Sequence, residues 1–560
     1  MPWTQNYAAI GNSIGLTALA VSLPIFYLFW ALAIKRMKGH IAGSTTLLFT
    51  IIDVIIVYKM PVGLAISASL LGILNGLFPI AWIIVTAVFL YNLTVEAGQF
   101  DIIKSSIASL SNDRRLQALL IAFSFGAFLE GAAGFGTPVA ITGAILIGLG
   151  FEPLYAAGLC LLANTAPVAF GGIGAPILAA AAATGVSGNI ISAAVGRQLP
   201  FLSVFVPLYL IIVMAGWKGA KEVLPAILTA GVTFAIAQWW SSNFLGPMLP
   251  DIIASLFSLV CLATLLKFWK PKNIWRFPNE KGEKVEQYKK YTGGQILKAW
   301  SPFIVLTLIV AIWGTNSFKD YVGKTLKWFV MIPHWPGLDG FVMKAAPIVK
   351  KPTLYAANYK FDFFAYAGTA ILITAVITMI ILRISPARSA KVAGTTLKTL
   401  IYPVITIGSV LGFAYIANYS GLSYTLGLLF AQTGHAFPFF SPMLGWLGVF
   451  LTGSDTSANA LFGQLQNVSA QQIGINPILA IAANSSGGVM GKMISPQSIA
   501  VAAAATGLVG RESDLFRFTL KHSIFLLLLV CIMTYLQAYV FQGMMPTIAG
   551  IMPMIASILH

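Results

Sequence analysis

Hydrophobic residues gather in stretches of about 20 along the whole chain, the length at which an α-helix crosses the hydrocarbon core of a bilayer. We assign twelve spans to these stretches: 12–34, 41–58, 70–96, 153–184, 198–216, 222–241, 248–268, 299–314, 364–384, 398–418, 477–506 and 516–542. Two more apolar stretches, 116–149 and 438–469, are interrupted at mid-length by Gly, Ser and a single carboxylate. We interpret them as re-entrant hairpins that enter and leave on one side of the membrane. The pattern predicts an all-α polytopic membrane protein with about 12 transmembrane helices and two re-entrant hairpins.

The composition supports this class. Of the 560 residues, 58% are hydrophobic and 9% are charged, whereas soluble globular chains carry about 25% charged residues. This balance excludes a cytosolic enzyme, a disordered chain and a nucleic-acid binder. Membrane lipid is the expected surrounding of the spans, and the sequence does not indicate an oligomeric state.

The formal net charge of +17 indicates orientation. If the first 13 residues lie outside, the inside loops hold 24 of the 34 Lys and Arg residues and the outside loops hold 9, of which seven fall in one long loop at 319–360. An excess of cations in inside loops is the positive-inside rule. The charge therefore predicts topology and not a polyanionic partner.

The sequence shows no pattern for a metal, a cofactor or hydrolysis. Cys160, Cys261 and Cys531 lie in apolar segments without metal-like spacing, and the five histidines are scattered. No P-loop, GxSxG or HExxH sequence is present. The cations follow the first apolar run instead of preceding it, so no cleavable signal peptide is visible. We therefore expect no cofactor, no metal and no enzymatic activity.

The chain contains an internal repeat. GAFLEG at 126–131 recurs as GVFLTG at 448–453, and AAAATG at 180–185 recurs at 502–507. Between them, Asn164, Gly171 and Pro176 recur with the same internal spacing as Asn484, Gly491 and Pro496. In the topology above, the span 41–58 runs inside to outside and its counterpart 364–384 runs outside to inside, so the repeats are predicted to be inverted. Inverted repeats with paired broken segments are typical of secondary transporters, whose site lies near the membrane midplane.

This repeat divides the chain into five regions. They are an N-terminal helix at 1–40, repeat 1 at 41–216, connecting helices and loops at 217–363, repeat 2 at 364–542 and a C-terminal tail at 543–560. Repeat 1 contains the hairpin 116–149 and a broken helix at 153–184, and repeat 2 contains the hairpin 438–469 and a broken helix at 477–506.

The four interruptions of the apolar segments form the candidate site. They lie at 130–138, 164–167, 453–459 and 484–491. Helix ends in lipid leave backbone groups unpaired, so such breaks persist only where protein, water or a ligand satisfies them, and an N-terminal helix end suits a carboxylate. The breaks carry neutral polar residues that either bind substrate or only cap the broken helices: Asn164, Thr165, Ser454, Thr456, Ser457, Asn459, Asn484, Ser485 and Ser486.

Glu130, Asp455 and Lys492 are ionisable residues embedded in apolar segments. A charge at the bilayer centre costs at least about 2.5 kcal/mol, so each is a functional hypothesis. Glu130 and Asp455 occupy equivalent hairpin tips, where burial favours the neutral form of a carboxyl group and allows it to hold a proton. The alternative is a structural ion pair of Lys492 with one of them. Asp53 lies on an otherwise apolar span, and we interpret it as structural.

Six long motifs resemble the lactate permease family: EGAAGFGTPVAI (130–141), LYAAGLCLLANTAPVAFG (154–171), GRQLPF (196–201), FLTGSDTSANALFG (450–463), GGVMGKMISPQSIA (487–500) and VGRESDLFRF (509–518). The resemblance extends over nearly the whole chain and is weakest from 270 to 360. It implies a multi-pass symporter of the bacterial inner membrane that imports L-lactate, D-lactate or glycolate with a proton. By analogy with a wider class of ion transporters, it also implies an elevator-like mechanism.

The resemblance implies a set of site residues at matching positions. These positions are Glu130, Asn164, Thr165, Ser454, Asp455, Asn484, Lys492 and Ser495. From the chemistry of the residues, we expect Lys492, Asn164, Thr165, Ser454, Asn484, Ser485 and Ser495 to bind substrate, and Asp455, ahead of Glu130, to couple the proton. Thr137 and Met490 depart from the family pattern beside this site, which leaves the substrate preference open.

Two alternatives remain open from the sequence. A sodium-coupled carboxylate carrier is one, because hairpin carbonyls with Asn and Ser also hold Na⁺. A membrane-embedded enzyme with Glu130 and Asp455 as acid and base is the other, although an inverted duplication favours transport.

Overall fold

The structure, a computed structural model, describes residues 2–134, 136–277, 291–314, 316–326, 330–331 and 334–546. Within them, nine helices are long and apolar enough to cross a membrane, and the bent pair Pro153–Ala163 and Val168–Thr184 makes a tenth if it is one span. The prediction of an all-α, multi-pass membrane protein is confirmed. Most of the predicted C-terminal tail lies outside the described residues.

Each predicted span coincides with helical structure. The first is α1 (Ile14–Val21), α2 (Leu23–Phe29) and η1 (Trp30–Ile34), followed by α3 (Gly39–Val57) and by α4 (Val62–Asn75), η2 (Gly76–Ala81) and α5 (Trp82–Glu96). The others outside the hairpins and broken helices are α13 (Leu199–Glu222), α14 (Leu224–Phe244), α15 (Pro250–Phe268), α16 (Gly293–Gly314), α18 (Ala367–Leu382), α19 (Pro386–Ser420) and α25 (Glu512–Tyr539). The segments Val62–Glu96 and Pro386–Ser420 are each 35 residues long and exceed the predictions at 70–96 and 398–418. The apolar pattern missed the first turns of α19 because they carry Arg388 and Lys391.

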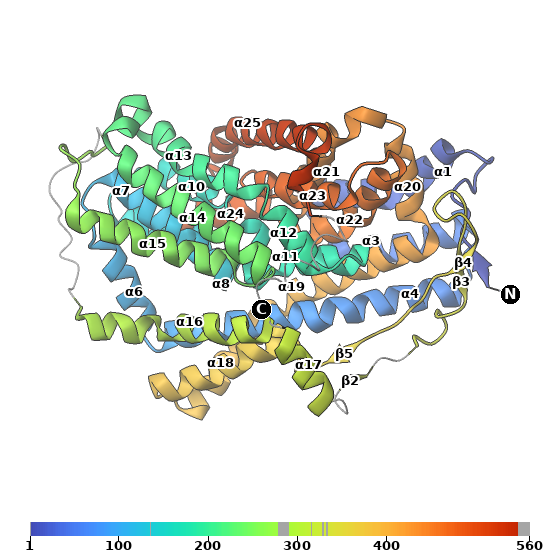
Figure 1. The fold of residues 1–560 in the computed structure, drawn as a ribbon, viewed down its shortest axis with the longest axis horizontal. Helices are drawn as coiled ribbons and strands as arrows, with labels where there is room; N and C mark the ends of the chain where they lie inside the picture. Colours follow the sequence, from blue (N-terminus) through green and yellow to red (C-terminus); the bar gives the residue numbers. More distant parts are fainter. Residues whose placement is uncertain are drawn as a thin grey trace.

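The two 35-residue segments, at equivalent places in the two repeats, run antiparallel (Figure 1). A Cβ atom on Gly72 would lie 2.8 Å from the Cα of Gly412, and one on Gly76 would lie 3.0 Å from the Cα of Gly408. At the far end of α5, Glu96 accepts a hydrogen bond from Arg388 at 3.0 Å. Small residues let the two backbones approach closely at the crossing. An antiparallel course is the one expected of equivalent helices in the predicted inverted repeats.

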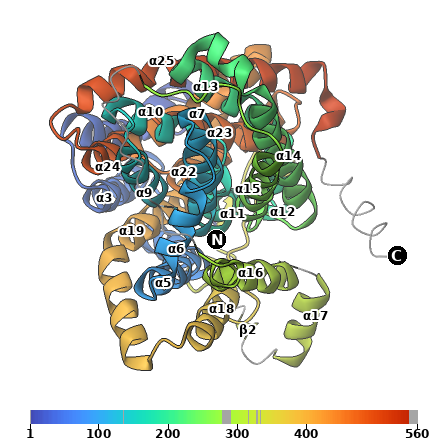
Figure 2. The same ribbon diagram turned by 90° about the vertical axis from the view of Figure 1, so that its left-hand side faces the viewer.

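The hairpin and broken-helix regions form helix–turn–helix units. In repeat 1 the units are α7 (Arg114–Gln117), η3 (Ala118–Phe125) and α8 (Gly126–Ala132) with α9 (Thr137–Gly148), then α10 (Pro153–Ala163) with η4 (Val168–Phe170) and α11 (Gly171–Thr184). In repeat 2 they are α21 (Phe437–Thr452) with α22 (Asp455–Gln472), then α23 (Pro477–Lys492) with α24 (Pro496–Thr506). Figures 1 and 2 place α13 and α25 on one side of these units and α16 and α18 on the opposite side of the molecule.

The interruption predicted at 484–491 is wrong. Helix α23 continues through Lys492, and the break lies at residues 493–495. The glycines there serve close packing: a Cβ atom on Gly487 would lie 2.0 Å from the carbonyl oxygen of Pro442, and one on Gly491 would lie 2.3 Å from that of Trp446. Glycine removes the side chain that would hold α21 and α23 apart, so it does not mark a helix end here.

Shorter elements complete the described fold. They are the helices α6 (Gln99–Ala108), α12 (Gly188–Val195), α17 (Asn316–Thr325) and α20 (Leu422–Ala431), with η6 (Gly434–Ala436) and η7 (Gln542–Met544), and the strands β1 (Trp3–Thr4), β2 (Val330–Met331), β3 (Val342–Lys344), β4 (Thr353–Leu354) and β5 (Phe361–Asp362). Strand β1 pairs in parallel with β3, which pairs antiparallel with β4, and β2 pairs antiparallel with β5. The β1–β3 pairing joins the N-terminus to the long loop, two segments that the charge distribution assigns to the same side.

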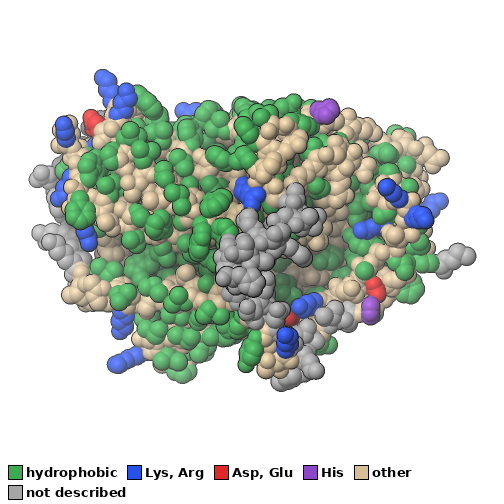
Figure 3. Space-filling model, viewed as in Figure 1, with side chains coloured by type: hydrophobic (Ala, Val, Ile, Leu, Met, Phe, Trp, Pro, Cys, Tyr) green, Lys and Arg blue, Asp and Glu red, His purple; other side chains and the backbone are tan. Residues whose placement is uncertain are grey.

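Two large hydrophobic clusters organise the interior. The larger extends from α5 through α16 and α18 to α23–α25, and the second joins α1–α4 to α19, α20 and α22. Hydrophobic side chains also cover much of the surface in Figure 3, as expected where lipid is the solvent.

Candidate functional site

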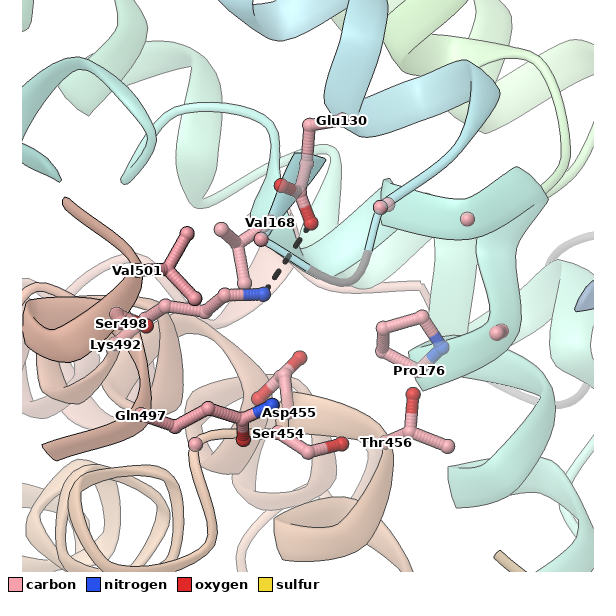
Figure 4. Close-up of a pocket in the computed structure, with 16 residues that line it drawn as sticks. Glu130, Val168, Pro176, Ser454, Asp455, Thr456, Lys492, Gln497, Ser498 and Val501 are labelled. Atoms are coloured by element: carbon pink, nitrogen blue, oxygen red, sulfur yellow. Dashed lines mark hydrogen bonds and ion pairs between the residues drawn. The ribbon is translucent and has the colours of Figure 1, made fainter. Parts of the chain in front are cut away.

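A single recess brings the two hairpins and the two broken helices together (Figure 4). It encloses about 570 Å³ of space between atoms, including the part open to solvent. Its lining residues are Glu130, Gly134, Gly136, Val168, Gly171, Gly172, Ala175, Pro176, Gly453, Ser454, Asp455, Thr456, Lys492, Gln497, Ser498 and Val501. All of them belong to the hairpin and broken-helix units, and the long antiparallel pair contributes none.

Four helices begin at this recess. Gly136 is the N-cap of α9, Asp455 starts α22, and Ser498 lies in the first turn of α24. Helix α11 takes regular helical dihedrals only after residues 172–174, which have positive φ, and its residues Ala175 and Pro176 line the recess. The first turn of a helix has free N–H groups and the positive end of the helix dipole. Convergence of several such ends favours an anion in the recess.

The first hairpin tip positions Glu130 beside a cation. Its turn uses Gly134 and Gly136, both with positive φ, a conformation that glycine adopts without steric cost. Glu130 is 2% exposed, and its Oε1 accepts a hydrogen bond from the Lys492 Nζ at 3.4 Å. Gly171 makes room for this carboxylate, because a Cβ atom there would lie 2.5 Å from Oε1.

The second hairpin tip surrounds its carboxylate with neutral donors. The turn uses Gly453 with φ of 70°, and Ser454 caps α22 by accepting from the Ser457 N–H at 3.2 Å. Asp455, 2% exposed, accepts through Oδ2 from the Ser485 hydroxyl at 2.5 Å and from the Asn459 amide at 3.3 Å. No cation lies within ion-pair distance of Asp455 in the described part of the chain.

Lys492 is the last residue of α23, where the negative end of the helix dipole favours a cation. Figure 4 shows its ammonium group directed toward Glu130, with Asp455 on the other side of the recess. The side chain is 12% exposed. The positive charge of Lys492 and the nearby helix N-termini together favour the binding of one additional anion in the recess.

A buried polar network continues behind Asp455. The Asn484 amide donates to the Asn459 side chain at 2.9 Å, and Gln466 donates to the Asn484 side chain at 3.1 Å. Asn459 also donates to the backbone oxygen of Pro176 at 3.1 Å, which ties α22 to α11. Such a network fixes the orientation of the carboxyl group at its end.

The structure divides the expected site residues into three groups. Glu130, Ser454, Asp455 and Lys492 line the recess. Asn484 and Ser485 lie in the network behind it, in mid-helix and not at a helix end as predicted.

The remaining three expected residues lie outside both the recess and the network behind it. Asn164 ends α10, and both polar atoms of its buried amide are without a hydrogen-bond partner among the described residues. Thr165, in the turn that follows α10, donates to the carbonyl of Leu162 in that helix. Ser495 caps α24 by accepting from the Ser498 N–H at 3.2 Å.

Sequence reasoning missed some residues at this site. Gln497 and Ser498 line it because α24 begins there, and their position after Pro496 in SPQS is a helix-start signal. Asp251, buried in the first turn of α15, is a further residue that the sequence pattern does not single out. Within the described residues no group of His, Cys, Asp and Glu side chains could hold a metal ion.

Comparison with known proteins identifies relatives of this chain. A family model described as L-lactate permease matches residues 17–541. An L-lactate permease from Bacillus subtilis is 56% identical and covers 98% of this chain and 100% of its own length. A glycolate permease from Escherichia coli is 54% identical, with 97% and 99% covered. A crystal structure of the transporter YdaH from Alcanivorax borkumensis aligns with a TM-score of 0.46 at 12% identity, covering 85% of this chain and 89% of that one.

The matches span nearly the whole length of this chain and of its relatives, which are named as permeases and not as enzymes. The resemblance in the six sequence motifs is thereby confirmed, and the chain belongs to the L-lactate permease family of membrane transporters.

Proposed function

We propose that this protein is a secondary carrier of the bacterial inner membrane that imports small 2-hydroxy monocarboxylates, namely L-lactate, D-lactate or glycolate, together with a proton. The observation that carries the proposal is the recess itself, where one lysine lies among four helix N-termini and both hairpin tips. This arrangement fits a small monoanion. The names of the lactate and glycolate permease relatives support the substrate class.

Substrate binding proceeds by exchange of partners on Lys492. The lysine is a point charge that does not require a planar fork, so a substrate carboxylate replaces the Glu130 carboxylate at its ammonium group. The 3.4 Å distance of the existing pair is long for a charge-assisted hydrogen bond, which makes the exchange less costly. Ser454 and Ser498 also line the recess and offer hydroxyl groups to the 2-hydroxyl of the substrate.

Asp455 carries the coupling proton, and Glu130 is the second candidate. Asp455 is fully enclosed and has no paired cation in the described chain, so its neutral form is the less costly one. Figure 4 shows Asp455 on the side of the Lys492 ammonium group away from Glu130, so an anion that binds Lys492 also acts on Asp455. Coupling requires the loaded carrier to cross with a proton on this group and the empty carrier to cross in one fixed state.

An elevator-like motion is the proposed route across the membrane. Support comes from the lining of the recess, which belongs entirely to the hairpins and broken helices. The hairpins and broken helices together carry the whole site, so they can move as one unit past the long antiparallel helices while the site stays intact. Single-cysteine accessibility at Thr137 and Thr456 in outward and inward conditions tests this motion, which predicts that both positions change sides together.

Uptake of labelled lactate into proteoliposomes tests the function. A pH gradient, acid outside, and a Na⁺ gradient are each applied alone, with unlabelled D-lactate and glycolate as competitors. We expect the pH gradient alone to drive accumulation. Accumulation under the Na⁺ gradient alone would assign the carrier to sodium coupling, and no uptake under either gradient would contradict the proposed function.

A further inference from the structure

Asp251 is a buried carboxyl group without a role in the site described above. It is the second residue of α15 and is 1% exposed, and neither of its side-chain oxygens has a hydrogen-bond partner among the described residues. It does not line the recess. A buried polar group with no partner is rare and costly in a folded protein, so its presence needs an explanation.

The neighbour of Asp251 is the first hairpin. A Cβ atom on Gly131 would lie 2.7 Å from the Cβ of Asp251, and Glu130 is the residue next to Gly131 on α8. Helix α15 packs against η3, α8 and α14, and within these elements Glu130 is the only ionisable side chain. Asp251 thus faces a like charge and no cation.

The protonation state of Asp251 follows from this setting. Two neighbouring buried carboxyl groups do not both ionise beside a single cation, and Lys492 pairs with Glu130. A first-turn position usually favours a carboxylate through the free N–H groups, but neither Asp251 oxygen accepts such a bond. Asp251 is therefore the neutral acid of the pair, and a neutral carboxylic acid has an O–H to donate.

An acceptor for that O–H is present on the same hairpin. Glu130 Oε2 is buried and has no hydrogen-bond partner in the described chain, while Oε1 is held by Lys492. The two carboxyl groups are not hydrogen-bonded in this conformation. Glu130 therefore has one carboxylate oxygen paired with Lys492 and a second oxygen that is free to accept a hydrogen bond.

We propose that Asp251 is a positioning residue that receives Glu130 when a substrate carboxylate takes Lys492. The neutral Asp251 donates its O–H to the released Glu130 carboxylate, so a buried anion is never left without a partner. Asp251 keeps its proton throughout this exchange. The coupling proton is a different one, which is bound and released at Asp455. The inference rests on the proposed function, because the substrate carboxylate is what displaces Glu130.

The pair has a pH-dependent consequence. Loss of the Asp251 proton in alkali removes the donor and adds a second negative charge beside Glu130. Lys492 is then held by the two carboxylates and is less available to substrate. We expect the lactate affinity to fall as the pH rises above neutral, and we expect ionisation of Asp251 to cause part of this loss.

Lactate binding to the purified full-length protein, measured by calorimetry from neutral to alkaline pH, tests the inference. Asp251→Asn keeps a neutral donor, and we expect affinity near neutral pH within about threefold of wild type and an alkaline midpoint moved upward. Asp251→Leu has similar size but no donor, and we expect it to bind about 10- to 100-fold more weakly, the effect of one hydrogen bond to a charged group. Loss of the Lys492 charge at higher pH is common to all three proteins.

The outcomes separate the two proposals. Wild-type affinity in Asp251→Leu together with an unchanged alkaline midpoint in Asp251→Asn would overturn the role of Asp251 and leave the proposed function intact. If Asp251→Leu does not yield a monodisperse protein, the alkaline midpoint of Asp251→Asn alone decides. A wild-type protein that binds no lactate would refute the proposed function itself.

Discussion

The two hairpin tips have the same architecture and different chemistry. In each, one helix ends, a glycine with positive φ turns the chain and a second helix begins at the recess. The carboxyl group of the first, Glu130, contacts a lysine, whereas that of the second, Asp455, contacts a hydroxyl and an amide. A paired carboxylate keeps its charge while its cation is present, and an unpaired buried one favours its neutral form. Under the proposed function, the first tip is suited to exchange with an anionic substrate and the second to carrying a proton.

Removal of the Lys492 charge should have the largest effect on lactate binding. Lys492→Met leaves the recess without its positive charge, so we expect lactate affinity to fall more than about 100-fold, as for loss of one partner of a buried charge pair. Isothermal titration with lactate measures this, with Lys492→Arg as the variant that keeps the charge. Affinity unchanged in the Met variant would make Lys492 a structural partner of Glu130 only.

Neutralisation of the second tip should abolish coupling while binding persists. Asp455→Asn fixes a neutral state, so we expect loss of pH-driven accumulation but retention of lactate exchange, because exchange does not require the proton to leave. Glu130→Gln is the matched variant at the first tip, and we expect it to accumulate lactate. The reverse result would pass the coupling role to Glu130. Normal accumulation in both variants would exclude both tips and leave Asp53, also buried, as a candidate.

Much of this comparison was predictable from the sequence. Glu130, Asp455 and Lys492 stand out because a charge in an apolar segment is costly, and the repeated motifs place the two carboxyls at matching positions. The pairing of Lys492 with Glu130 instead of Asp455 was not predictable, because sequence spacing does not give side-chain direction across 362 residues.

The errors have physical causes as well. Gly487 and Gly491 suggested a helix break, but glycine within a membrane helix also permits close helix packing, as it does here against α21. Asp251 looked like an ordinary acid in the first turn of a span, and only the packing of α15 against α8 shows that it is enclosed. The short strands within 330–362 pair with distant or irregular segments and leave no periodic signal.

A methyl group placed against each carboxyl group tests how rigidly each hairpin tip holds its side chain. In Gly488→Ala the new Cβ would lie 2.3 Å from Asp455 Oδ1 and 2.8 Å from Val449, so we expect a destabilisation of about 1–3 kcal/mol and impaired accumulation. In Gly171→Ala the Cβ would meet the movable end of Glu130, 2.5 Å away at Oε1, so the carboxylate should shift away from Lys492 at a smaller cost in stability.

Thermal unfolding and lactate titration of both variants distinguish the two effects. Gly488→Ala should lower the melting temperature more, and Gly171→Ala should change the affinity more. Equal changes in both properties would mean that the two carboxyl groups are held with the same rigidity, contrary to the difference proposed here.

The smallest expected effect is at the hydroxyl that contacts Asp455. Ser485 donates to Oδ2 at 2.5 Å, which stabilises the charged form, so Ser485→Ala should make Asp455 retain its proton more readily. Loss of one such bond is worth about 1 kcal/mol, and we expect the pH midpoint of lactate accumulation to rise by about half a unit to one unit. Ser486→Ala is the matched control, because that hydroxyl donates to Gln198 and not to a carboxyl group, and its midpoint should stay at the wild-type value. A midpoint that moves equally in both variants, or in neither, would show that the hydroxyl does not tune the second tip, and the contrast between the two hairpins would then rest on the Glu130–Lys492 pair alone.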